Sequence, residues 1–246
     1  MKKLGLIGHP VSHSKSPDFF KAKLSSISRR DVVYKAYDIE SINDLEKLLG
    51  NEPDIMGLNV TIPHKVDILS WVNELDEVAR EIGAVNTIVR SESGWKGFNT
   101  DAWGFSCSLK PFIKGRHERA LILGSGGASK AVKYSLKKLG IETVVVSRHA
   151  TEGKVEYGEL TAEALRHYLL IVNCTPLGTH PNIKGCAMIP WDGVGEKHLM
   201  VDLVYNPEET TFMKRAIKRG ATAMNGSDML RLQAERSLDI WLEHGL

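Results

Sequence analysis

The sequence has few of the features that mark secreted, metal-binding or membrane proteins. It contains only three cysteines, Cys107, Cys174 and Cys186, and their odd number and wide spacing exclude a disulfide framework or a cysteine-based zinc site. They are typical of reduced thiols. An apolar run of the roughly 18 residues that a membrane span needs is also absent. We therefore expect a cytoplasmic protein.

The sequence also lacks an excess of charge of one sign. Its 32 basic and 30 acidic residues leave a formal net charge of +2, and no long run of one sign forms a surface for nucleic acid or membrane. With 42% hydrophobic and 25% charged residues among 246, it has the composition of a globular protein of two small domains. The partner to expect is a small molecule.

The order of apolar and helical segments predicts the fold class. Strand-length apolar blocks alternate with helical patterns, which is typical of α/β domains with a mainly parallel sheet. In the first half the strands are expected at 4–8, 32–39, 55–62 and 84–89, and the helices at 17–28, 41–49 and 64–81. A helix at 101–112 precedes a second series with strands at 119–123 and 142–147, a helix at 127–139, and further strands within 168–176 and 198–205. The tail from Gly226 reads as one amphipathic helix that packs back on the first domain.

A glycine-rich turn opens the second series. "LILGSGGASKAV" places Gly124, Gly126 and Gly127 between an apolar strand and a helix. Such a turn lets a pyrophosphate approach the backbone and the N–H groups at the start of the helix. The spacing departs from strict G-x-G-x-x-G, but the strand, turn, helix and second strand follow in order. The pattern favours dinucleotide binding over a plain tight turn.

The end of the next strand indicates which dinucleotide is bound. An acidic residue there suits a free ribose hydroxyl, whereas a cation suits the 2′-phosphate of NADP. This chain presents Ser147, Arg148 and His149, with no acid before Glu152. NADP is therefore favoured, although Arg148 has the alternative reading of a solvated surface residue.

A lysine and an aspartate follow polar segments of the first half. "NVTIPHK" carries Thr61 and ends with Lys65 in the expected first turn of a helix, "GAVNT" carries Asn86, and "GFNTD" ends with Asp101. Strand carboxyl ends share one edge of a parallel sheet, so these side chains can converge. A lysine beside a carboxylate suits proton transfer to a carbonyl oxygen during hydride transfer. The alternatives are a surface lysine, a helix cap at Asp101 and turn asparagines. His9, His13 and His64 might suggest a metal site, but His9 and His13 lie in a loop without a carboxylate or cysteine nearby in sequence, and no metal is expected.

Eight motifs in order resemble one enzyme family. They are "HPVSHSKSP", "NVTIPHK", "GAVNT", "GFNTDAWGF", "GSGGASKA", "NCTPLGTHP", "VDLVYNPEET" and "NGSDMLRLQAERS", and they cover essentially the whole chain. The chain thereby resembles shikimate dehydrogenases, NADP-dependent oxidoreductases that interconvert 3-dehydroshikimate and shikimate on the route to chorismate and the aromatic amino acids. The resemblance implies two α/β domains with a cleft between them. It assigns residues 1–102 with 228–246 to substrate binding and catalysis, and 103–227 to a Rossmann-type NADP-binding domain. It implies a monomer or homodimer.

The resemblance also implies roles for individual residues. Lys65 and Asp101 form the catalytic pair. Substrate contacts come from Ser14 and Ser16 to the carboxylate, and from Thr61, Asn86, Asp101, Gln233 and Tyr205 to the rest of the molecule. Cofactor contacts come from Glu77, Gly124, Ser125, Gly126, Gly127, Ala128, Ser147, Arg148, Asn173, Thr175, Leu203 and Gly226.

Some positions depart from the family pattern. A second arginine usual four residues after Arg148 is Glu152, an arginine after the glycine turn is Lys130, and a histidine near the serines is Phe20. NAD therefore stays possible as cofactor. The alternatives are an NAD-dependent quinate/shikimate dehydrogenase, a non-catalytic dinucleotide-sensing module, and a folate dehydrogenase of similar shape, for which the two serines are poorly suited.

Overall fold

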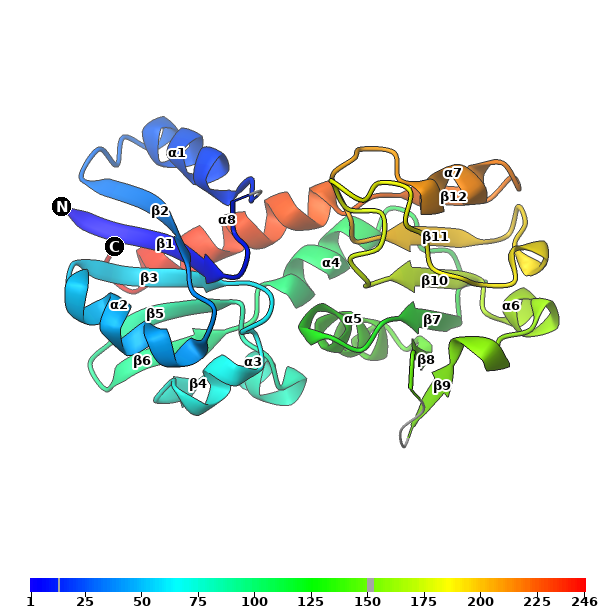
Figure 1. Cartoon of the computed structure of the whole chain (residues 1–246), viewed down its shortest axis with the longest axis horizontal. Helices are drawn as coiled ribbons and strands as arrows, with labels where there is room; N and C mark the ends of the chain where they lie inside the picture. Colours follow the sequence, from blue (N-terminus) through cyan, green and yellow to red (C-terminus); the bar gives the residue numbers. More distant parts are fainter. Residues whose placement is uncertain (13, 150–152) are drawn as a thin grey trace. The chain divides into compact units, whose positions relative to one another are not determined.

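The computed structural model describes residues 1–12, 14–149 and 153–246. The chain folds into two compact units, Met1–Thr100 with Gln233–Leu246 and Asp101–Leu232. Each unit contains a six-stranded sheet with helices beside it (Figure 1). The predicted α/β fold class is confirmed. Among the described residues, every helix is too short or too polar to cross a membrane.

The sheet of unit 1 has the strand order β2-β1-β3-β5-β6-β4. Its strands are β1 (Lys2–Gly8), β2 (Val32–Asp38), β3 (Ile55–Val60), β4 (Glu74–Leu75), β5 (Thr87–Ser91) and β6 (Gly94–Phe98). Its helices are α1 (Ser16–Ser26), α2 (Leu45–Asn51), preceded by the 3₁₀ turn Ile42–Asp44, and α3 (Glu77–Ile82). Strands β1, β2 and β3 pair in parallel, as their apolar, doubly buried sequences predict.

The prediction of a long helix at 64–81 is wrong. The backbone turns after Thr61, forms only a 3₁₀ segment at Asp67–Ser70, and then enters β4, which pairs with β6. A new helix, α3, starts where Asp76 accepts hydrogen bonds from the N–H groups of Val78 and Ala79. Because an N-cap ends any preceding helix, the apolar periodicity of this segment belongs to three short elements. Lys65 therefore lies in a turn and not in the first turn of a helix, where the positive end of the helix dipole would disfavour a lysine.

The strand expected at 84–89 is displaced and runs in the opposite direction. It begins at Thr87 and forms an antiparallel hairpin with β6, which the sequence analysis did not predict. Strand β6 begins directly after the hairpin turn with Gly94, whose φ of 120° is strained for other residues. Because β5 runs antiparallel to β3, its first residue lies beside the end of β3, with Thr87 opposite Asn59. Residues that precede β5 therefore reach the same edge as residues that follow β3.

The final helix, α8 (Ser227–Glu243), completes unit 1 with its second half. Trp241 packs with Leu4, Phe20 and Leu238, and its indole N–H donates to the carbonyl of Ile88 at 3.0 Å. A Cβ on Gly57 would lie 2.3 Å from the indole nitrogen, so only glycine admits this contact. The expected packing of the tail on the first domain is confirmed.

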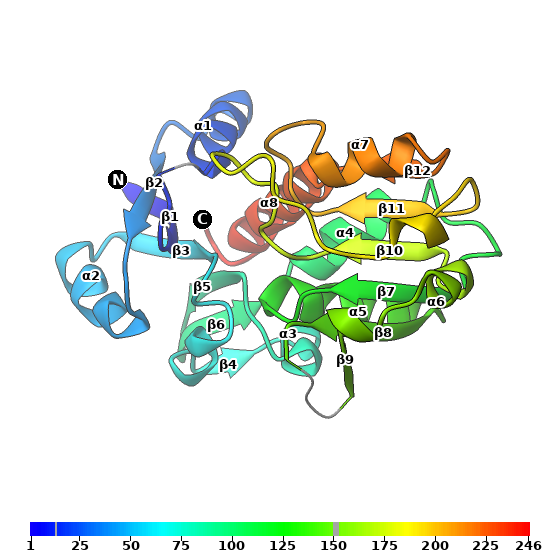
Figure 2. The same ribbon diagram turned by 45° about the vertical axis from the view of Figure 1, so that its right-hand side comes forward.

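The sheet of unit 2 has the strand order β12-β11-β10-β7-β8-β9, and its neighbouring strands pair in parallel throughout the described residues (Figure 2). Its strands are β7 (Arg119–Leu123), β8 (Glu142–Ser147), β9 (Lys154–Glu156), β10 (Leu170–Asn173), β11 (Leu199–Asp202) and β12 (Thr222–Met224). Its helices are α4 (Asp101–Leu109), α5 (Gly127–Lys138), α6 (Ala162–His167) and α7 (Thr211–Ile217). The order reverses between β7 and β10, as in doubly wound dinucleotide-binding folds.

The two faces of this sheet carry separate apolar cores. On one face, Val132 and Leu136 of α5 and Phe105 of α4 pack on Ile122 and Val172. The opposite face is covered by α6 and α7, whose apolar side chains pack on the alternate strand residues. Both faces are buried, which explains the nearly continuous apolar runs of β7 and β10.

Candidate active site

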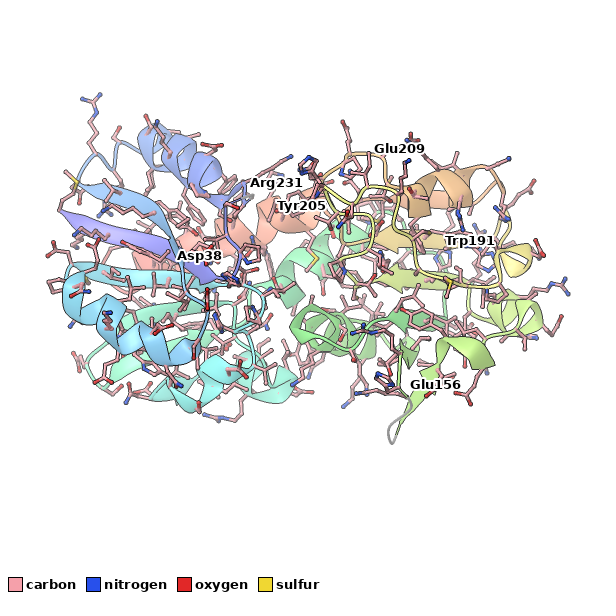
Figure 3. All side chains as sticks on the ribbon, in the orientation of Figure 1. Asp38, Glu156, Trp191, Tyr205, Glu209 and Arg231 are labelled. Atoms are coloured by element: carbon pink, nitrogen blue, oxygen red, sulfur yellow. The ribbon has the colours of Figure 1, made fainter. Side chains whose placement is uncertain are left out.

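The serine loop between β1 and α1 is held to the end of β2. Asp38, the last residue of β2 (Figure 3), accepts hydrogen bonds from His9 Nδ1 at 2.6 Å and from the N–H of Val11 at 3.2 Å. The pair raises the pKa of His9 and lowers the pKa of Asp38. Ser14 Oγ accepts from the N–H of Ser16 at 3.2 Å, so the Ser14 proton stays available to a ligand. The described part of the loop thus brings the two serines together. His13, which the sequence analysis excluded as a metal ligand, lies outside the described residues.

Thr61 and Lys65 follow the end of β3. The N–H of Thr61 donates to the carbonyl of Ile7 in β1, and the carbonyl of Lys65 accepts from the N–H of Val85 at 2.8 Å. His64 is buried, and its Nε2 lies 2.8 Å from the carbonyl of Ile39. A carbonyl only accepts, so Nε2 donates. These contacts fix the backbone of Lys65 beside the segment that carries Asn86.

Asn86 and Gln233 belong to a buried cluster of amides and hydroxyls. Asn86 Nδ2 donates to Thr100 Oγ1 at 2.8 Å and to Gln233 Oε1 at 3.3 Å, and Asn86 Oδ1 accepts from the N–H of Thr100 at 2.7 Å. Asn59 Nδ2 donates to Ser237 Oγ at 3.0 Å. We call this set the amide cluster: Asn59, Asn86, Thr87, Thr100, Gln233 and Ser237. Buried polar groups that satisfy one another keep fixed orientations, and such orientations suit the recognition of ligand hydroxyls.

Two residues of the expected substrate site belong to unit 2. Asp101 is the first residue of α4 and is buried. Tyr205 follows β11 and is partly buried (Figure 3), and burial raises the pKa of its phenol. The pairing of Lys65 with Asp101 stays a prediction.

The glycine turn of unit 2 has the geometry of a phosphate cradle. Gly124 has a φ of 103°, and Gly126 caps α5 without a side chain, which leaves the first N–H groups of that helix available. A Cβ on Gly126 would meet no atom within 4 Å, so the space over the turn is open. Ser125 is exposed there, and Gly127 and Ala128 begin α5. These residues fit a pyrophosphate at a helix N-terminus.

The expected adenosine-phosphate residues lie at the end of β8. Ser147 is buried and its hydroxyl donates to the carbonyl of His149, whereas Arg148 is exposed. An exposed arginine at this edge is available to an anion. Glu77 is exposed in the first turn of α3 in unit 1, while the other expected cofactor residues belong to unit 2. The role of Glu77 stays a prediction.

The ends of β10 and β11 carry a second buried polar group. Asn173 Oδ1 accepts from Thr175 Oγ1 at 2.6 Å, and Asn173 Nδ2 donates to Asp202 Oδ1 at 2.8 Å. Thr210 Oγ1 donates to Asp202 Oδ2 at 2.6 Å. Burial raises the pKa of Asp202, and these hydrogen bonds oppose the shift. Asn173 and Thr175 are therefore brought together and held by an aspartate that the sequence analysis missed.

Leu203 and Gly226 lie side by side. A Cβ on Gly226 would be 2.1 Å from the carbonyl oxygen of Leu203, so the two backbones approach more closely than any other residue permits. The resemblance implied a cofactor role for both residues, and the close approach explains the glycine. Asp202 could have been indicated by the sequence, because a buried strand that closes on a polar residue brings it to the ligand edge.

The fold of unit 2 and its glycine turn define a dinucleotide-binding protein of the doubly wound α/β class. Comparisons with known proteins identify the family. A family model described as "Shikimate dehydrogenase substrate binding domain" matches residues 6–88. The NADP⁺-dependent shikimate dehydrogenase of Methanococcus maripaludis strain C7 is 37% identical over 98% of this chain and 91% of its own length.

Solved structures agree with these matches. A shikimate dehydrogenase in complex with NADP⁺ has a TM-score of 0.87 and 32% identity, covering 99% of this chain and 90% of that one. The enzyme from Thermus thermophilus, in complex with NADP(H) and shikimate, has a TM-score of 0.87 and 31% identity, covering 99% and 94%. This chain belongs to the shikimate dehydrogenase family, a family of oxidoreductases, and the resemblance noted in the sequence is confirmed.

Proposed function

We propose that the protein is an NADP-dependent shikimate dehydrogenase, which reduces the ketone of 3-dehydroshikimate to the alcohol of shikimate and catalyses the reverse reaction. The observation that carries the proposal is the amide cluster, which presents Asn86 and Gln233 in fixed orientations near the backbone of Lys65. Family membership at 37% identity over nearly the whole chain supports the same activity.

In the proposed mechanism Lys65 is the general acid and base. NADPH supplies a hydride to the carbonyl carbon when it is bound. The Lys65 ammonium donates a proton to the oxygen as the alcohol forms, and it accepts that proton in the reverse direction. Asp101 is proposed to orient the ammonium and to share its proton. Thr61, Asn86, Gln233 and Tyr205 orient the substrate through its hydroxyl groups.

The serine loop is proposed to bind the substrate carboxylate. Ser14 and Ser16 supply neutral hydroxyl donors at the start of α1, where Pro17 occupies the first helical turn. Neutral donors leave the Lys65 charge available for catalysis. The carboxylate and the ketone of one small ring can then be held by two separate groups of side chains.

The cofactor site is proposed to use backbone groups of unit 2. Gly124, Ser125, Gly126, Gly127 and Ala128 would hold the pyrophosphate through the start of α5, and Ser147 with Arg148 would hold the adenosine phosphate. Asn173, Thr175, Leu203 and Gly226 would line the nicotinamide end, with Glu77 as a further contact. Under this proposal unit 1 supplies most of the substrate contacts and unit 2 binds NADP. The expected domains, 1–102 with 228–246 and 103–227, stay a prediction, since the compact units end at Thr100 and begin again at Gln233.

An NAD-dependent quinate/shikimate dehydrogenase is the second candidate. It is favoured by the residues at the end of β8, where Ser147 and His149 flank Arg148 and the Ser147 hydroxyl is engaged by the carbonyl of His149. A weaker phosphate site would reduce the preference for NADP over NAD.

Steady-state oxidation of shikimate and of quinate with each cofactor tests both candidates. Turnover is measured by the absorbance of the reduced nicotinamide. We expect kcat/KM to be highest with shikimate and NADP⁺. A higher value with quinate and NAD⁺ would favour the second candidate, and no turnover in any of the four combinations would refute both.

We further propose that the protein is cytoplasmic, which its three free cysteines support. We also propose a monomer or homodimer, and sedimentation would determine the oligomeric state.

A further inference from the structure

Tyr34, in β2, connects the serine loop to the amide cluster, and no sequence motif includes it. Its ring stacks on Phe20 with centroids 4.3 Å apart and an angle of 14° between the planes, and Trp241 lies on the same apolar cluster. The aromatic neighbours fix the ring, so the hydroxyl occupies one defined position.

The hydroxyl of Tyr34 donates in a fixed direction. It lies 2.8 Å from Asn59 Oδ1. The other amide atom, Asn59 Nδ2, donates to the backbone carbonyl of Asn86 at 3.4 Å, and a carbonyl only accepts, so the amide orientation is set and Oδ1 must accept. Burial raises the pKa of Tyr34 well above its usual value, which keeps the phenol protonated at neutral pH.

Ser16 of the serine loop lies close enough to the Tyr34 hydroxyl to act on it as a hydrogen-bond partner, and this interaction lowers the pKa of Tyr34 in opposition to burial. Because the Tyr34 proton is directed to Asn59, Ser16 is the donor in that interaction. A single oxygen therefore touches both a residue expected at the substrate carboxylate and the amide cluster expected at the ring hydroxyls.

We propose that Tyr34 is a positioning residue, which holds the Ser16 hydroxyl and the Asn59 amide in one hydrogen-bonded chain and thereby couples the carboxylate end of the substrate site to its hydroxyl end. The chain continues from Asn59 through Thr87 to Asn86 Oδ1, and from Asn86 Nδ2 to Gln233 Oε1. The inference rests on the proposed function, because it assigns shikimate to this site.

The same strand offers a matched control. Tyr37 lies three residues further along β2, and its hydroxyl is buried without a hydrogen-bond partner among the described residues. Tyr37→Phe removes a phenolic oxygen from the same strand and breaks no such chain. Tyr34→Phe keeps the ring and its stacking on Phe20, so folding is expected to be preserved.

The experiment compares Y34F, Y37F, S16A and the double variant Y34F/S16A. We expect Y34F to raise the KM and the calorimetric Kd for shikimate about three- to tenfold, the scale of one or two hydrogen bonds, with kcat and the KM for NADP⁺ within about twofold of wild type. Y37F should match wild type. Adding Y34F to S16A should raise KM by less than Y34F does alone, because Tyr34 acts partly through Ser16. A purely structural role would lower kcat together with the affinity for shikimate, and its effect on KM would not depend on whether Ser16 is present.

Three results would overturn the proposal: Y34F equal to Y37F, a lower KM in Y34F, or fully additive effects with S16A. If Y34F does not fold, the test instead compares the side-chain amide signals of Asn59 between wild type and S16A in a nitrogen–proton NMR spectrum. These signals should shift in S16A if the chain is continuous, and unchanged signals refute it. Failure of the proposed function looks different, because wild-type protein would then turn over no shikimate with either cofactor.

Discussion

The candidate sites of the two units consist of different chemical groups. In unit 1 the candidate site consists of side chains, namely serine hydroxyls, a lysine and the amide cluster, whose members hydrogen-bond to one another. In unit 2 the glycine turn presents backbone N–H groups, and Gly126 keeps them accessible because it has no side chain. Side chains select the hydroxyl pattern of a particular small molecule, whereas backbone groups accept any pyrophosphate. Substitutions should therefore affect the two units in different ways.

The largest effect is expected from Lys65→Ala in unit 1. Loss of proton transfer should reduce kcat by about a hundredfold to ten-thousandfold, while the Kd for shikimate changes little. Lys47→Ala, an exposed lysine of α2, serves as the control. Normal turnover in the Lys65 variant would exclude it as the acid and base.

The next effect is expected from Gly126→Ala in unit 2. A Cβ here meets open space, so the stability of the protein should stay within about 1 kcal/mol of wild type. The methyl group would nevertheless occupy the phosphate cradle, and we expect the Kd for NADPH, measured by fluorescence, to rise at least about tenfold, or 1.4 kcal/mol. Gly195→Ala, which also meets open space, is the matched control. Equal Kd values in the two variants would remove the cradle from the cofactor site.

A smaller effect is expected from the serine loop. Ser14→Ala and Ser16→Ala should each raise the KM for shikimate by about three- to tenfold, since one hydroxyl contact contributes roughly 0.5–1.5 kcal/mol. The KM for NADP⁺ should not change. An unaltered KM for shikimate in the double variant would show that the serines do not bind the carboxylate.

The smallest effect is the pH dependence of the His9–Asp38 pair. The pair raises the pKa of His9, so its stabilising contribution is complete below about pH 6.5 and is lost as pH rises through the raised value. It lowers the pKa of Asp38, so the contribution is complete above about pH 3.9 and is lost as pH falls through the lowered value. Titration by NMR should give a His9 pKa above 6.5 that returns to about 6.5 in Asp38→Asn. Identical values in both proteins would contradict the pairing.

The sequence predicted local features of the site better than distant ones. Ser14 and Ser16, and the turn from Gly124 to Gly127, depend on neighbours within a few residues, and their motifs were sufficient. The residues 64–81 and 84–89 were read wrongly because β4 and the β5–β6 hairpin are stabilised by pairing across the sheet. The alternating "TIVRS" and "GWKGF", joined by Glu92 and Ser93 with Gly94 directly after them, carried a hairpin signal.

The polar clusters could not be predicted in the same way. Asn59 and Ser237 are separated by 178 positions in sequence, and their hydrogen bond exists only because α8 returns to unit 1. Tyr34 and Asp202 have no unusual neighbours in sequence, and only burial with named partners distinguishes them. Local pattern reasoning has no access to such partners before the fold is known.

The return of α8 also sets an order of events during synthesis. Unit 2 is one continuous segment, Asp101–Leu232, whereas unit 1 needs Gln233–Leu246 to supply Gln233, Ser237 and Trp241. A ribosome therefore releases every residue of unit 2 before unit 1 can close its core, although unit 1 is begun first. The sheet of unit 1 lacks the packing of Leu238 and Trp241 until α8 emerges, so we expect the second half of α8 to be the final part of the protein to gain protection from hydrogen exchange.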